Sequence, residues 1–70
     1  MQRVAVTSSN IRSVGYDPES HTLEVEFTSG GVYQYFGVPP GVHASLMQAS
    51  SHGTYFASHI KKVYRYSKIG

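Results

Sequence analysis

Alternation of apolar and polar side chains is clearest between positions 21 and 28, where Leu23, Val25 and Phe27 are each separated by one polar residue. A period of two predicts a strand with one buried face and one solvated face. The glutamates at positions 24 and 26 fall on the solvated face. This segment therefore defines the core side of a predicted sheet.

A second strand is predicted just before it, beginning at Ile11, and Asp-Pro-Glu-Ser at positions 17–20 suits a type I turn because proline presets the backbone angle at its second position. Pairing of Tyr16 with His21 across this turn would place Val14 opposite Leu23. Val14 and Tyr16 would then lie on the core face.

The glycine-rich segment 29–31 decides where Tyr33 and Tyr35 point, because a shift of one residue in register moves a whole strand to its other face. A two-residue loop, Ser29-Gly30, would place both tyrosines in solvent. A three-residue loop ending at Gly31 would set Tyr33 opposite Phe27 and Tyr35 opposite Val25, in the core. The second loop is favoured because a left-handed residue at its last position prefers glycine. It turns Val32 and Phe36 outward.

Helical periodicity replaces alternation after Pro39-Pro40. A helix is predicted from Pro40 to Ala49, with Val42, Leu46 and Ala49 in one apolar stripe, and Ser50-Ser51-His52-Gly53 is expected to stop it. Thr54 is expected to cap a second short helix, in which Phe56 and Ile60 share one face and Tyr55 and His59 another. From Lys61 a period of two predicts a last strand that carries Tyr64 and Tyr66 on one face and Arg65 on the other.

These elements predict an α+β fold: a small antiparallel three-stranded meander, a C-terminal strand, and one or two short helices packed on one face. Residues 11–70 form a single domain, and residues 1–10 are either a tail or an extra edge strand. The expected core aromatics are Tyr33, Tyr35, Phe27 and Phe56. In a chain of 70 residues the core is small, so these rings supply much of the buried area.

Charge is distributed unevenly along the chain. The net charge is only +2, but all four acidic residues lie in the first half, whereas Lys61, Lys62, Arg65 and Lys68 lie within the last ten residues. This asymmetry suggests an anionic partner for the C-terminal end or a solubilised terminal strand. The chain has neither a signal-like N-terminus nor an apolar run that could span a membrane, so a cytoplasmic location is expected.

The four histidines invite a metal or acid-base interpretation, which the spacing does not support. No pair has the spacing of a helical zinc site, and no carboxylate follows Glu26. His43 is expected on the wet side of the first helix and His59 beside Tyr55. No metal, cofactor or catalytic residue is therefore predicted, and an enzyme is not expected.

The remaining candidate is the basic, aromatic C-terminus, formed by Lys61, Lys62, Tyr64, Arg65 and Lys68. Aromatic faces that stack unpaired bases, beside cations that contact phosphates, are what single-stranded nucleic-acid binding requires. The same pattern also fits core-facing tyrosines with a basic solvent face. A third possibility is a protein-interaction module that uses a sheet edge or the outward Val32 and Phe36, for a protein partner or self-association.

From Ile11 to Tyr66 the chain resembles the KTSC domain, found at the C-terminus of some lysyl-tRNA synthetases and as a stand-alone bacterial or phage protein. The resemblance rests on the order and spacing of five short features: Tyr33-Gln34-Tyr35, Val38-Pro39, Ala49-Ser50-Ser51-His52-Gly53, Tyr55-Phe56 with Ile60, and Tyr64-Arg65-Tyr66. It implies a single small domain, and the synthetase association implies RNA or tRNA as a partner.

Overall fold

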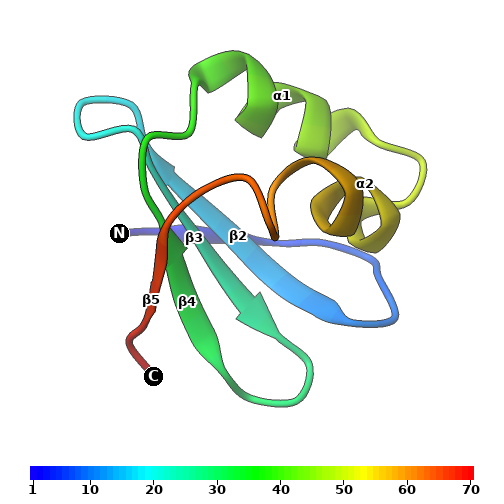
Figure 1. Ribbon diagram of the computed structural model, residues 1–70. Coiled ribbons are helices and arrows are strands. Elements are labelled where there is room, and N and C mark those ends of the chain that lie inside the picture. The colour runs from blue at the N-terminus through cyan, green and yellow to red at the C-terminus, as the bar shows by residue number, and fades with distance from the viewer.

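One antiparallel sheet of five strands runs through the molecule, and both helices pack on the same face of it (Figure 1). The computed structural model describes residues 1–70. Strands follow one another in chain order across the sheet, and the two helices are inserted between the last two. The elements are β1 (Arg3–Ala5), β2 (Ile11–Asp17), β3 (Thr22–Phe27), β4 (Val32–Tyr35), α1 (Pro40–Gln48), α2 (His52–His59) and β5 (Tyr66–Lys68).

The α+β class is confirmed, but the sheet has five strands, because part of the N-terminal segment is an edge strand. β1 pairs antiparallel with β2, with Val4 opposite Val14. Gly15 permits this close approach, since a Cβ atom there would lie 2.7 Å from the carbonyl oxygen of Gln2.

The first hairpin differs from its predicted register by two residues. Tyr16 pairs with Leu23, and Val14 pairs with Val25. The loop has the expected four residues but lies one position later, at residues 18–21, because the Asp17 carboxylate accepts hydrogen bonds from the Glu19 amide and the Ser20 hydroxyl, and His21 closes the loop in the left-handed conformation, with φ of 53°. A shift of two preserves the faces, so Val14 and Tyr16 still point toward the core.

The second hairpin has a three-residue loop, one position earlier than predicted. The Gly30 amide donates to the Phe27 carbonyl, the Phe27 amide donates to the Gly31 carbonyl, and Gly30 rather than Gly31 has a positive φ, 106°. Tyr33 therefore pairs with Val25 and Tyr35 with Leu23. Both tyrosines lie on the core face, as the three-residue loop predicts.

The first helix agrees with its predicted start at Pro40, whose missing amide hydrogen is harmless in the first turn. The second helix begins earlier than predicted. Ser51, not Thr54, is its N-cap, and the Ser51 hydroxyl accepts a hydrogen bond from the Thr54 amide at 3.2 Å. His52 and Gly53 are therefore part of α2 instead of a stop. Neither helix has the length and apolar character that a membrane-spanning helix requires.

The predicted strand beginning at Lys61 was placed too early. Residues 61–64 form turns, because the amides of Val63 and Tyr64 both donate to the carbonyl of the buried Ile60. β5 begins only at Tyr66, where it pairs with Tyr35 of β4. Tyr64 and Tyr66 thus do not share a strand face, since Tyr64 lies outside the strand.

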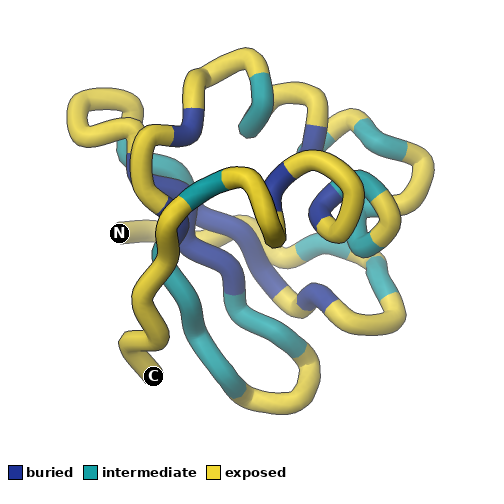
Figure 2. The backbone as a smooth tube through the Cα atoms, viewed as in Figure 1, coloured by how far each residue is buried: buried dark blue, intermediate teal, exposed yellow.

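Buried residues gather where the helices cover the sheet, and the tip of the β3–β4 hairpin extends beyond this cover (Figure 2). The core consists of nine buried side chains: Ile11, Val14, Leu23, Val25, Tyr35, Val38, Leu46, Phe56 and Ile60. Burial of apolar surface on this scale is the main force that stabilises the fold. The uncovered hairpin end leaves aromatic side chains at the margin of the core.

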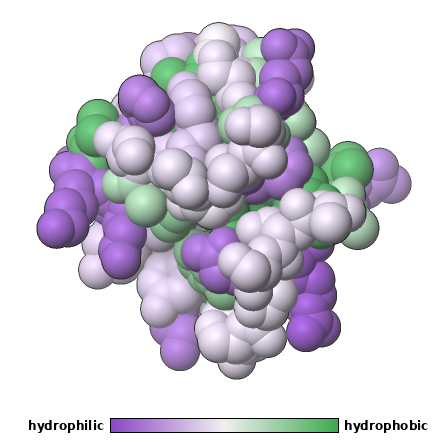
Figure 3. Space-filling view, turned by 90° about the vertical axis from the view of Figure 1, so that its right-hand side faces the viewer, coloured by the Kyte–Doolittle hydropathy of each residue, from purple (hydrophilic) through white to green (hydrophobic).

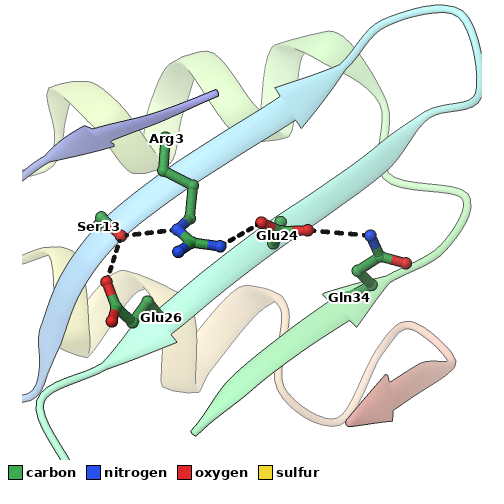
Figure 4. Close-up of polar contacts among 5 residues, drawn as sticks. All are labelled: Arg3, Ser13, Glu24, Glu26 and Gln34. Carbon is green, nitrogen blue, oxygen red and sulfur yellow. Dashed lines mark hydrogen bonds and ion pairs between the residues drawn. The ribbon is translucent and has the colours of Figure 1, made fainter. Parts of the chain in front are cut away.

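The opposite face of the sheet carries a chain of polar contacts (Figure 4). Arg3 reaches across β2 to form an ion pair with Glu24, and Gln34 donates to the same carboxylate at 2.9 Å. Ser13 accepts a hydrogen bond from Arg3 and donates one to Glu26. Burial raises the pKa of Glu24, but the hydrogen bonds from Gln34 and Arg3 and the charge of Arg3 outweigh it and lower the pKa below its usual value. Through Arg3, this network joins β1 to β2 and β3 and stabilises its place at the edge of the sheet.

Candidate nucleic-acid interface

An open groove of about 1070 Å³ lies between the β3–β4 hairpin and the segment that connects α2 to β5. Its lining combines residues from the predicted core with residues from the predicted binding segment. The former are Phe27, Tyr33, Tyr35 and Phe56, and the latter are Lys61, Lys62, Tyr64 and Arg65. Two groups of residues distant in sequence thus form one surface.

The aromatic side of the groove continues into the core. Tyr35 and Phe56 are buried and meet edge to face with ring centres 5.2 Å apart, whereas Phe27 and Tyr33 are half-buried and meet at 5.6 Å. Burial, together with the neighbouring Tyr33 and Tyr66, raises the pKa of Tyr35 to about 12. Its hydroxyl therefore stays protonated at neutral pH and adds no negative charge to the groove.

The other side of the groove is basic. Lys61 and Lys62 are exposed on the turn after α2, and Arg65 is exposed just before β5, where its carbonyl accepts a hydrogen bond from the Phe36 amide. No aspartate or glutamate lines the groove. An anionic ligand would meet three cationic side chains here without a competing carboxylate.

Tyr66 was not among the predicted binding residues, yet it is the exposed ring of the groove. The residue is 59% exposed, while Tyr64, the predicted stacking residue, is half-buried against the core. The sequence signal for Tyr66 is its place in the Tyr-Arg-Tyr motif. Which of Tyr64 and Tyr66 is exposed in the groove follows only from the strand register, in which Tyr66 lies opposite Tyr35.

Lys68 does not line the groove but lies beside it. It pairs with Tyr33 across β4 and β5, so the two side chains share the face on which the groove opens. Of the predicted cations, Lys61, Lys62 and Arg65 therefore meet in the groove, and Lys68 extends the basic surface along β5.

The histidines do not converge. His43 is half-buried and stacks on Tyr16 with ring centres 4.5 Å apart, so its predicted place on the wet side of α1 was wrong; burial lowers its pKa. His59 packs beside Tyr55 at 4.4 Å, as predicted. No three side chains of His, Asp or Glu lie close enough together to hold a metal ion.

A second hollow, of about 880 Å³, contains His43 and Asp17 but no lysine or arginine.

The outward residues Val32 and Phe36 do not form one apolar patch. Phe36 is 41% exposed, but Val32 is half-buried, and its backbone bonds to Ile69 and Gly70. The side of the molecule in Figure 3 likewise has its hydrophobic side chains in small groups separated by pale and hydrophilic ones.

The profile of the KTSC domain matches residues 7–66, which includes every element except β1 and the last two residues of β5. The chain belongs to the KTSC domain family. The crystal structure of a KTSC domain protein from Yersinia pestis superposes with a TM-score of 0.96 and 46% sequence identity, covering 99% of this chain and 97% of that one.

Relatives of this KTSC domain are found alone and within larger proteins. An uncharacterised protein of Stutzerimonas stutzeri is 51% identical over 70 residues, which is 99% of each chain. A lysine–tRNA ligase of Nostoc punctiforme is 39% identical over 61 residues, which make up 87% of this chain but only 11% of the ligase. The domain thus corresponds to a small segment of the synthetase.

Proposed function

We propose that this KTSC domain is a non-catalytic module that binds RNA through the groove between the β3–β4 hairpin and residues 61–66. The observation that carries the proposal is the composition of the groove: aromatic rings on one side, three cations on the other, and no acidic residue. Aromatic surfaces beside cations are what nucleic-acid binding requires when bases are contacted as well as phosphates.

The relatives support the same proposal. This KTSC domain is similar to part of a lysine–tRNA ligase, and the name of that enzyme gives tRNA as its substrate. A domain joined to such an enzyme meets tRNA at high effective concentration, so even weak binding would be useful there. In a stand-alone protein the same groove would have to bind RNA unaided.

The test is a titration of the protein with tRNA and with an unstructured RNA at several salt concentrations. Each phosphate neutralised on a single strand contributes about −0.7 to the slope of log K against log salt. We expect the single substitutions Lys61→Gln and Lys62→Gln each to weaken binding and to reduce the slope by about 0.7 for each lost phosphate contact. Both side chains are exposed, so the fold should not change.

Two control variants sharpen this test. Arg12→Gln removes the same charge from an exposed residue that does not line the groove, and we expect it to weaken binding less. Phe36→Ser tests the protein-interaction alternative and should leave RNA affinity unchanged. Absence of binding at low salt, or equal loss for Arg12→Gln and either lysine variant, would refute the proposal.

A further inference from the structure

The aromatic residues of the groove differ in what they offer a ligand. Tyr35 and Phe56 are buried, and the rings of Phe27, Tyr33 and Tyr64 are half-buried. Tyr66 alone among them is mostly exposed, at 59%. Only one ring of the groove therefore presents a broad free surface.

The Tyr66 ring packs against the rings of Tyr33 and Tyr35. Its centre lies 5.9 Å from that of Tyr33 and 5.7 Å from that of Tyr35, and Tyr35 in turn rests on Phe56. The backbone of Tyr66 pairs with Tyr35 in the sheet. A ring supported in this way loses little conformational freedom when a ligand covers it, which favours binding.

Cations surround the site of this ring on two different segments of the chain. Lys68 is two residues further along β5 and therefore on the same face, about 7 Å away along the strand. Lys61 and Lys62 line the groove in which the ring lies. A nucleotide whose base covers Tyr66 would thus have positive charge available for its flanking phosphates.

We propose that the groove binds an unpaired nucleobase stacked on Tyr66, so that the domain selects single-stranded RNA over duplex. This inference rests on the proposed function and specifies its ligand. In an A-form duplex each base is paired and stacked on its neighbours, and its faces cannot reach a side chain. Only an unpaired base, in a loop or at an end, can cover the ring. Because only one ring of the groove is mostly exposed, we expect one stacked base per domain.

The experiment compares an unstructured RNA with an RNA duplex that has the same number of phosphates, each titrated against the wild-type protein, Tyr66→Leu and Tyr66→Phe. We expect the wild type to bind the unstructured RNA more tightly. Tyr66→Leu should weaken that binding about 5- to 160-fold while leaving the duplex affinity and the salt slope unchanged. Tyr66→Phe should retain wild-type affinity, because stacking needs only the ring.

A direct readout is the nuclear magnetic resonance spectrum of the Tyr66 ring protons, which a stacked base shifts upfield. If Tyr66→Leu weakens the binding of both RNAs equally or of neither, and the lysine variants still weaken it, the stacking inference is wrong and the proposed function stands. If neither RNA binds the wild type at low salt, the proposed function fails and the inference fails with it.

Discussion

Gly15 occupies a position in β2 that has no room for a side chain. A Cβ atom there would lie 2.7 Å from the Gln2 carbonyl oxygen and 3.1 Å from the Arg3 side chain, so the N-terminal strand would have to move. We expect Gly15→Ala to lower the free energy of unfolding by about 1–3 kcal/mol, the range of overpacking in tight sites. Urea denaturation measures this loss.

Gly41 provides the matched control for this substitution. It lies in the first turn of α1, and nothing lies within 4 Å of the position of its missing Cβ. Because alanine has the higher helix propensity, Gly41→Ala should be neutral or stabilise the protein by up to about 1 kcal/mol. If Gly15→Ala proved equally harmless, the close packing of β1 on β2 would be wrong.

Glu24 makes the stability of the fold depend on pH. Its pKa is lowered from 4.5 in the folded protein, so its contribution is present above this value and is lost as the pH falls through the lower folded pKa. We expect Glu24→Gln to reduce the free energy of unfolding at neutral pH by about 1–3 kcal/mol, since hydrogen bonds to a charged group are lost.

The measurement for Glu24 is urea denaturation of both proteins between neutral and acidic pH. The difference between them should shrink as the pH falls below 4.5 and through the lower pKa of the folded protein, where the native Glu24 carboxylate becomes protonated. The Ser20 hydroxyl and the Glu19 amide lower the pKa of Asp17 as well, but Asp17 is present in both proteins and cancels in the comparison. A difference that stays constant with pH would contradict the role of the Glu24 charge.

At the scale of elements, α2 depends on its cap. The hydroxyl of Ser51 accepts the Thr54 amide, and the helix carries Phe56 into the base of the groove. We expect Ser51→Ala to destabilise the protein by about 1 kcal/mol, the usual cost of a lost N-cap.

Thermal unfolding of Ser51→Ala beside Ser50→Ala tests this cap. Ser50 is exposed and makes no side-chain hydrogen bond, so its replacement should be nearly neutral. Equal melting temperatures for the two variants would show that the cap contributes nothing.

Alternation along β3 was sufficient to predict which side chains face the core, even though the register of both hairpins differs from its prediction by two residues. A side chain changes face only when the register shifts by an odd number. The exact pairing depends on how Asp17, His21 and Gly30 shape their turns, and such turn geometry is poorly determined by residue type alone. The core face was therefore predictable, and the register was not.

The C-terminal segment was harder to predict because alternation there is misleading. Residues 61–66 have the period of a strand, but the burial of Ile60 and two hydrogen bonds to its carbonyl curl the chain through Tyr64. The cations of the candidate site could be chosen from local sequence. The exposed ring could not, because Tyr66 meets Tyr33 and Tyr35 only through long-range pairing of β5 with β4.

Over the whole molecule, the two faces of the sheet differ in charge. The groove and its cations lie on the face that the helices cover, whereas Glu24 and Glu26 point to the other face, where Arg3 partly neutralises them. Although the net charge is only +2, this separation orients the field of the domain. A polyanion would approach with the groove foremost, and the rate of association would fall as salt increases.

The long connection between β4 and β5 has a consequence for the order of folding. The other neighbouring strands are joined by short loops, but β5 can pair with β4 only after residues 36–65 have folded back over the sheet. The entropy of closing so long a loop must be lost before the few bonds of a three-residue strand form, so this pairing forms late and opens early. The β5 side of the groove should therefore open more readily than the central strands, and a ligand bound there would slow hydrogen exchange at the β5 amides.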